Sequence, residues 1–154
     1  AEAPAEHKVI TGKVVGVADG DTVTVLTANK EQHRIRLQGI DAPERNQASG
    51  QRSKQHLSDL VFGQAVTVPW RKLDPYGRVV GQVLLPDGTD VNLAQLKAGL
   101  AWFFRRYERE LDPKTRQVYI EAEESARSKK VGLWSDPNAT APWDYRRAQR
   151  NVGL

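Results

Sequence analysis

The chain has no cysteine and no methionine, and its apolar residues nowhere form a run long enough to cross a membrane. Without cysteine, disulfide bonds, thiolate catalysis and Cys-ligated zinc are excluded. Of the 154 residues, 39% are hydrophobic and 27% charged, a composition that fits neither a membrane protein nor a long disordered chain. The sequence therefore predicts a soluble protein with one folded domain.

The missing methionine also bears on the beginning of the chain. A sequence without an initiator methionine has been trimmed or starts at a chosen domain boundary, and residues 1–7 are polar or small. We expect a flexible N-terminal segment over 1–7 and a secreted or periplasmic protein whose signal peptide has been removed. A chosen boundary would explain the same sequence equally well.

Charge is unevenly distributed along the chain. The formal net charge is +4, and residues 45–78 alone hold six cations against two acids, which accounts for the whole excess. A basic stretch of this kind suits a polyanionic partner that is bound through its phosphates, although a solvated face would show the same composition. The charge pattern therefore permits nucleic-acid binding without requiring it.

Apolar and polar residues alternate in several short segments, as expected for strands with one buried face. In the third of these segments Ile35 and Leu37 share one face, while Arg34 and Arg36 share the other. Turn residues such as Asp19-Gly20-Asp21 separate the segments. The sequence predicts strands over residues 8–18, 22–26, 32–40, 65–70 and 78–85.

The period changes between these strands. Leu57, Leu60 and Val61 have helical spacing, with Ser49 as a predicted N-cap and Gly63 just after the expected end. Two more helices are predicted over 92–98 and 117–129. Five strands with a helix between the third and fourth fit an α+β fold, namely a five-stranded Greek-key barrel of the oligonucleotide-binding (OB) type with three α-helices.

Charged side chains are concentrated where the predicted strands meet loops. Phosphodiester hydrolysis needs a hard cation held by carboxylate oxygens, a group to orient or deprotonate water, and fixed positive charge on the phosphate. Asp21 and Asp41 could hold the cation, and Glu44 could act on water. Arg36 and Arg78 could supply the positive charge, because a guanidinium stays ionised and donates two hydrogen bonds to one phosphate.

Each of these patches also has a purely structural explanation. Asp-Gly is a common hairpin turn, and Asp87-Gly88 is a second example in this chain. The Asp41-Ala-Pro-Glu44 segment could simply open a loop, and Arg78 could be a solvated strand residue. The patches point to a functional site only when they are taken together and in this order.

Taken together, the motifs resemble those of the staphylococcal nuclease family. The resemblance rests on Asp19-Gly-Asp-Thr22, on Arg36 followed by Asp41-Ala-Pro-Glu44, and on Tyr76-Gly-Arg78. It extends from about Lys8 to Trp134. We therefore assign residues 8–135 to a nuclease-like domain and 136–154 to a C-terminal extension that packs on the domain or trails from it.

The resemblance implies a calcium-dependent nuclease, indifferent to the sugar, that cuts DNA and RNA to leave 3′-phosphates and acts as a monomer away from membranes. Its implied catalytic residues are Arg36, Glu44 and Arg78. The implied Ca²⁺ ligands are Asp21, Asp41 and the backbone carbonyl of Ala42, with Asp19 and Glu44 acting through water, and the implied substrate contacts are Tyr76 and Tyr107.

The sequence departs from the family in places. Residues 45–49, between Glu44 and the first predicted helix, form a short segment without the lysine-rich insertion of the family's founding member. The second tyrosine of the family's nucleotide pocket is aligned here with Tyr107, and an alternative alignment places Arg105 at that position. In the extension, Trp143 is predicted to anchor on the domain and the neighbouring arginines to be solvated. The alternative function is a catalytically inactive OB-fold module that binds nucleic acid or a protein partner.

One geometric expectation concerns Arg36 and Asp41. They are five residues apart, so an unbroken strand would point them to opposite faces. Both can serve one phosphate only if the alternation breaks. We expect the chain to bend or bulge around Gly39, since glycine tolerates such a break at the lowest cost.

Overall fold

The computed structural model describes residues 8–152, so the expected flexible segment over 1–7 lies outside the described residues. Five strands close into a barrel in the order β1-β2-β3-β6-β5. Only β3 and β6 pair in parallel, and the other neighbours are antiparallel. The predicted five-stranded barrel is confirmed. Its strands are β1 (Lys8–Asp19), β2 (Thr22–Thr27), β3 (Gln32–Leu37), β5 (Ala65–Leu73) and β6 (Val79–Gly81).

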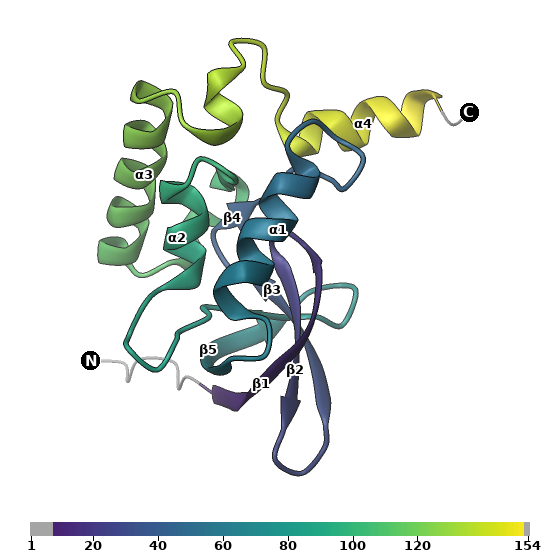
Figure 1. Cartoon of the computed structure of the whole chain (residues 1–154), viewed down its shortest axis with the longest axis vertical. Helices are drawn as coiled ribbons and strands as arrows, with labels where there is room; N and C mark the ends of the chain where they lie inside the picture. The colour runs from purple at the N-terminus through teal and green to yellow at the C-terminus, as the bar shows by residue number, and fades with distance from the viewer. Residues whose placement is uncertain (1–7, 153–154) are drawn as a thin grey trace.

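The long strand β1 closes the barrel because it serves two neighbours. Its residues 8–13 pair with β5, and its residues from Gly12 onward pair with β2. The register with β2 shifts between Val14 and Gly16 and again between Val17 and Asp19. Such irregularities increase the local bend of a strand, so β1 can curve from one side of the barrel to the other (Figure 1).

Alternate residues of the strands fill the barrel. Val23 and Val25 of β2 and Ile35 and Leu37 of β3 are completely buried, which confirms the face predicted from their alternation. Helix α1 (Gly50–Val61) closes one side of this core through Leu57 and Val61, which are also completely buried. The apolar core therefore fixes the strands whose ends carry the functional residues.

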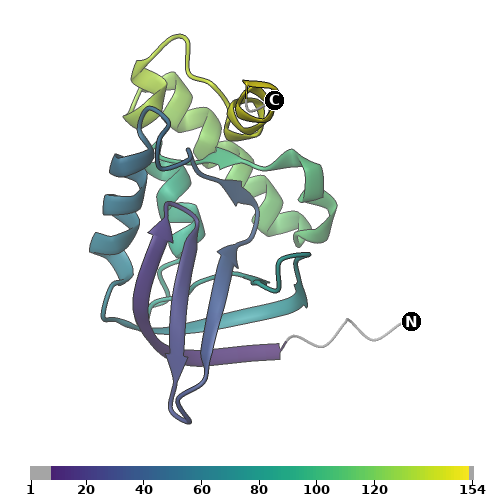
Figure 2. The same cartoon turned by 90° about the vertical axis from the view of Figure 1, so that its right-hand side faces the viewer.

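Helices α1, α2 (Val91–Lys97) and α3 (Pro113–Ser128) lie side by side against the barrel, and α4 (Pro142–Val152) lies apart from them (Figure 1). In Figure 1, α2 lies between α1 and α3, and α4, in yellow, extends beyond the end of α1. Figure 2 shows α4 end-on, on the side of the molecule that carries β4 (Ile40–Asp41). Two short 3-10 helices, η1 (Arg105–Glu110) and η2 (Gly132–Ser135), connect these elements. None of the helices within residues 8–152 has the length and apolar character that a bilayer span requires.

Three sequence-based predictions about these elements need correction. Ser49 precedes α1 in a left-handed conformation and makes no capping hydrogen bond with its side chain. Helix α3 begins at Pro113, earlier than predicted, because the carboxylate of Asp112 accepts hydrogen bonds from two backbone N–H groups of its first turn. The strand predicted over 78–85 ends at Gly81 and continues only as isolated bridges of Leu84.

Helix α4 is a fourth α-helix where the sequence predicted three. Three of its 11 residues are arginines and only a few are apolar, so apolar spacing alone did not predict a helix here. Its position depends on a tertiary contact. Trp143 packs edge-on against Trp102, with ring centroids 5.5 Å apart, and stacks on Phe104 at 5.8 Å.

Candidate active site

The predicted break in the third strand is present and is centred on Gly39. Strand β3 ends at Leu37, Gly39 has a φ of +85°, and the chain resumes as β4, which pairs with β7 (Trp102–Phe103). A β-carbon at Gly39 would also come within 3.1 Å of the side chains of Leu111 and Tyr119. Position 39 therefore requires glycine for two reasons, the positive φ and the lack of space.

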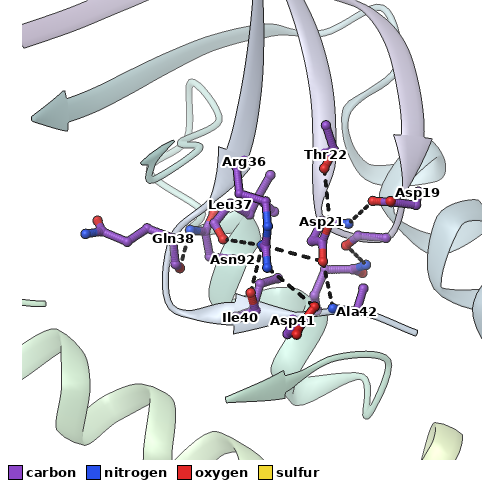
Figure 3. Close-up of polar contacts among 12 residues, drawn as sticks. Asp19, Asp21, Thr22, Arg36, Leu37, Gln38, Ile40, Asp41, Ala42 and Asn92 are labelled. Carbon is purple, nitrogen blue, oxygen red and sulfur yellow. Dashed lines mark hydrogen bonds and ion pairs between the residues drawn. The ribbon is translucent and has the colours of Figure 1, made fainter. Parts of the chain in front are cut away.

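This break brings Arg36 and Asp41 to the same side of the chain. Nη2 of Arg36 lies 3.4 Å from Oδ1 of Asp41. Nη1 of Arg36 donates to the backbone carbonyls of Leu37 and Ile40, at 2.9 and 2.8 Å (Figure 3). The arginine side chain is only 14% exposed. The turn around Gly39 thus holds the guanidinium rigidly, with backbone carbonyls on one side and carboxylates on the other.

The turn between β1 and β2 lies against this break. Oδ2 of Asp21 accepts a hydrogen bond of 2.8 Å from the backbone N–H of Ala42, and lies 3.5 Å from Nη1 of Arg36 (Figure 3). The backbone N–H of Asp21 in turn donates to Oδ1 of Asp19 at 3.1 Å. Asp21 and Asp41, twenty residues apart in the chain, therefore meet at one guanidinium, and Asp19 lies next to Asp21.

The Asp19-Gly20-Asp21 turn differs from an ordinary hairpin turn because α1 and α2 close over it. A β-carbon at Gly20 would collide with the side chain of Ser53, and the carbonyl of Gly20 accepts a hydrogen bond of 2.8 Å from the buried amide of Gln95. By contrast, Gly88, in the other Asp-Gly turn, has nothing within 4 Å of the position of a β-carbon. The surrounding packing distinguishes the two turns, which the sequence alone does not.

Burial and charge set the ionisation of the three aspartates. Burial and the neighbouring Asp21 raise the pKa of Asp19 to about 7. Burial would also raise the pKa of Asp21, but the charge of Arg36 and hydrogen bonds from its neighbours bring that pKa below its usual value. The pKa of Asp41 is raised by burial, which outweighs the opposing effect of two arginines. The site thus concentrates carboxylates that interact strongly with one another and with fixed cations.

Glu44 lies at the edge of the same cluster. Its side chain is 36% exposed, and its Oε1 accepts a hydrogen bond of 2.9 Å from Arg146 of α4. Arg146 also contacts Asp41, with Nη2 2.7 Å from Oδ2. The prediction that the arginines of the extension are solvated is therefore wrong for Arg146. The side chain of its neighbour Arg147 is 67% exposed and lies 3.8 Å from Asp144.

Arg78 faces the cluster from the other wall of the site. Its Nε binds Oδ2 of Asp74 at 2.6 Å, and its guanidinium lies 5.5 Å from the centre of the Tyr76 ring. Backbone N–H groups of Tyr76 and Arg78 also donate to Asp74, both at 2.9 Å. These bonds to Arg78 and Tyr76 outweigh burial and lower the pKa of Asp74. Arg78 is thus anchored by a single carboxylate on a turn, without direct contact to Asp21 or Asp41.

Tyr107 lies in η1, on the same side as Tyr76. Its ring packs edge-on against Phe104, and Nζ of Lys72 lies 4.7 Å from the ring centre. Arg105, the alternative in this register, pairs with Glu108 and does not line the groove. Both tyrosines have exposed rings, 74% for Tyr76 and 45% for Tyr107.

A single groove of about 710 Å³ joins all of these side chains. Carboxylates and Arg36 form its floor, and the turn that carries Arg78 lines one side. Arg146 and Arg150 of α4 also line it. The predicted side chains brought together there are Asp19, Asp21, Arg36, Asp41, Glu44, Tyr76, Arg78 and Tyr107, and Ala42 lies beside them through its bond to Asp21.

The donors fit a hard cation by their chemistry. Carboxylate oxygens of Asp21 and Asp41, together with a backbone carbonyl, are ligands that Ca²⁺ or Mg²⁺ prefers, and no histidine or cysteine is among them. Within residues 8–152, no group of three or more His, Cys, Asp or Glu side chains is arranged to hold a metal ion. Two carboxylates, a backbone oxygen and water are the ligand set that the family resemblance implied.

The closed five-stranded barrel, with carboxylates and arginines around one groove, matches the OB-type fold of nuclease domains. A family profile described as "Staphylococcal nuclease homologue" matches residues 34–136. The chain therefore belongs to the staphylococcal nuclease family.

Relatives extend the similarity over most of the chain. A "Micrococcal nuclease" of Shigella flexneri is 44% identical over 149 residues, which cover 92% of this chain and 83% of that protein. A "Protein ParB" of Escherichia coli is 41% identical, with 92% of this chain and 82% of that protein covered. An "Uncharacterized endonuclease" of Escherichia coli is 44% identical over 89% of this chain and 85% of its own length.

Several residues that shape the site were missed by sequence reasoning. Gln95 is completely buried and supports the turn at Gly20, and Asn92 donates to the carbonyl of Gln38 at 2.9 Å, next to the break at Gly39. Both lie on one short helix, where a pair of amides three residues apart was the only available signal. The motif containing Arg146 resembles a tail of bacterial family members, but its contact with the acids could not be predicted, because those partners lie about a hundred positions earlier in the chain.

Proposed function

We propose that this protein is a calcium-dependent nuclease that hydrolyses phosphodiester bonds in DNA and RNA and leaves 3′-phosphate products. One observation carries the proposal. Arg36, Asp21, Asp41 and Glu44 converge in a groove whose other wall presents Arg78. The nuclease and endonuclease names of its relatives support the same activity.

The residues on the floor of the groove suit the attacked phosphate. A Ca²⁺ held by Asp21, Asp41 and the carbonyl of Ala42 would supply positive charge against the phosphate oxygens. Arg36 presents a fixed guanidinium beside these ligands, so it can bind the phosphate without first being ordered. Glu44 would orient or deprotonate the attacking water, with Asp19 acting through water.

The outer wall suits the rest of the nucleotide. Nε of Arg78 is held by Asp74, so the two Nη groups remain to donate to a phosphate oxygen as charge develops on it. Tyr76 and Tyr107 offer exposed rings on the same wall, where bases can stack without sequence preference. The substrate would thus lie across the groove, with its phosphate between the two arginines.

The test is digestion of DNA and of RNA with Ca²⁺ or with a chelator. We expect cleavage only with Ca²⁺, and end-group analysis should find phosphate on the 3′ ends. Glu44→Gln should reduce the rate strongly while substrate binding persists, and Arg147→Gln on the exposed face of α4 is the matched control. Activity that survives the chelator would refute the calcium dependence. Binding without cleavage under any metal would favour the inactive OB-fold module.

A further inference from the structure

Helix α4 presents one face to the groove. Trp143, Arg146 and Arg150 are spaced by three and four residues, so they share one side of the helix. Trp143 is seated against Trp102 and Phe104, and Arg146 and Arg150 both line the groove. A second contact holds the segment before the helix, since the amide of Gln47 donates to the carbonyl of Thr140 at 2.5 Å.

Arg146 makes a two-pronged contact with Asp41. Its Nη2 lies 2.7 Å from Oδ2 and its Nη1 lies 3.2 Å from Oδ1, while Nη1 also donates to Oε1 of Glu44 at 2.9 Å. Paired bonds of this kind are stronger and more directional than a single contact between opposite charges. Asp41 itself is 1% exposed, so little water competes for its oxygens.

A divalent cation would need the same oxygens. Ca²⁺ binds carboxylate oxygens at about 2.3–2.6 Å, so on Asp41 it would lie only a few ångströms from the Arg146 guanidinium. Two positive charges at that separation in a partly buried site repel each other strongly. Arg36 leaves room on Asp41, because it approaches only Oδ1, at 3.4 Å, whereas Arg146 engages both oxygens, at 2.7 and 3.2 Å. Arg146 and the cation are therefore alternative occupants of Asp41.

We propose that Arg146 is an internal counter-ion that competes with the divalent cation for Asp41 and Glu44, so that helix α4 sets the affinity of the site for metal. This inference rests on the proposed function, because it takes Asp41 to be a cation ligand. Without a cation, Arg146 balances the carboxylates and holds Glu44 toward α4. When a cation binds, Arg146 leaves Asp41, while the packing of Trp143 keeps the helix in place.

The direct test is calorimetric titration of the full chain with Ca²⁺, without substrate. Arg146→Gln should bind Ca²⁺ about tenfold more tightly than the wild type, equal to about 1.4 kcal/mol. Arg147→Gln removes the same charge from the exposed side of the same helix and should change the affinity less than twofold. Equal or weaker binding by Arg146→Gln would overturn the inference. If neither the wild type nor Arg146→Gln binds Ca²⁺, the cation site of the proposed function fails as well, which is a distinguishable result.

Thermal unfolding separates competition from a merely structural role. In chelator, Arg146→Gln should unfold at a lower temperature than the wild type, because Asp41 loses its closest cation. In saturating Ca²⁺ the difference should vanish or reverse, since only the wild type must displace a guanidinium. An equal loss in both conditions would show that Arg146 only stabilises the fold. If Arg146→Gln does not fold, Arg146→Lys replaces it in these experiments. Lysine keeps the positive charge but cannot bind both oxygens of Asp41 as the guanidinium does, so this variant should tighten Ca²⁺ binding by about threefold.

Discussion

The two arginines that face the proposed phosphate are held in different ways. Arg36 is embedded in the break between β3 and β4, where it binds two backbone carbonyls and approaches two aspartates. Arg78 sits on an exposed turn and is held by Asp74 alone among the described acidic residues. Arg36 is thus bound into a backbone turn of the site, whereas Arg78 is held by one ion pair. Loss of Arg36 should therefore lower both stability and activity, and loss of Arg78 should lower mainly activity.

The largest effect is expected for Arg36→Ala. Removing this guanidinium takes positive charge away from Asp21 and Asp41 and removes one hydrogen bond from each of the carbonyls of Leu37 and Ile40. We expect a loss of about 3 kcal/mol in the free energy of unfolding, since breaking a buried ion pair costs about 3–5 kcal/mol. Urea denaturation measures this loss, and nuclease activity should be abolished. An Arg36→Ala protein as stable as the wild type would show that the guanidinium does not stabilise the fold.

Arg78→Ala should affect activity much more than stability. The rate should fall by about 10²–10³, the range observed when one donor to a developing oxyanion is removed. The free energy of unfolding should fall by no more than about 1 kcal/mol, because the ion pair with Asp74 is only partly buried. Single-turnover cleavage and urea denaturation of the same preparation test both. Arg147→Ala, at a more exposed arginine outside the groove, controls for the loss of one positive charge.

Gly39→Ala tests the backbone support of Arg36 and Asp41 without removing a charged group. The positive φ and the nearby Leu111 and Tyr119 both oppose a β-carbon, so unfolding should become easier by about 1–2 kcal/mol. Activity should fall by about tenfold to a hundredfold because Arg36 and Asp41 shift relative to each other. Gly88→Ala also has a positive φ but open space around it, and should cost less. Equal costs at the two positions would rule out crowding at Gly39.

Asp74→Asn should give the smallest effect. The amide oxygen can still accept backbone hydrogen bonds, but the ion pair with Arg78 is lost, so we expect a decrease in kcat of only about tenfold. Since the pKa of Asp74 is lowered by folding, its stabilising effect is present above the unfolded pKa of 3.8 and is lost as the pH falls through the folded value. In Asp74→Asn, the free energy of unfolding should therefore fall less steeply than in the wild type as the pH is lowered below 3.8.

The alternation of apolar and polar residues was sufficient to predict most of the barrel strands. The alternation around Ile35 and Leu37 identified the buried face of β3, and the odd spacing of Arg36 and Asp41 located the bend at Gly39. These predictions succeed because strand period and glycine conformation depend on adjacent residues. Predictions at element ends were poorer, as for Ser49 and for the start of α3, because caps depend on the geometry of a single turn.

The sequence by itself determined the barrel strands, the position of the bend and the acids and arginines that the site contains. Only the tertiary structure decided which of these groups touch, that Gln95 and Ser53 close over the turn at Gly20, and that Arg146 binds Asp41. The physical reason is that charge-assisted hydrogen bonds act over a few ångströms. Whether two groups approach that closely is settled by the packing of elements distant in the chain, as when Trp143 seats α4 on Trp102 and Phe104.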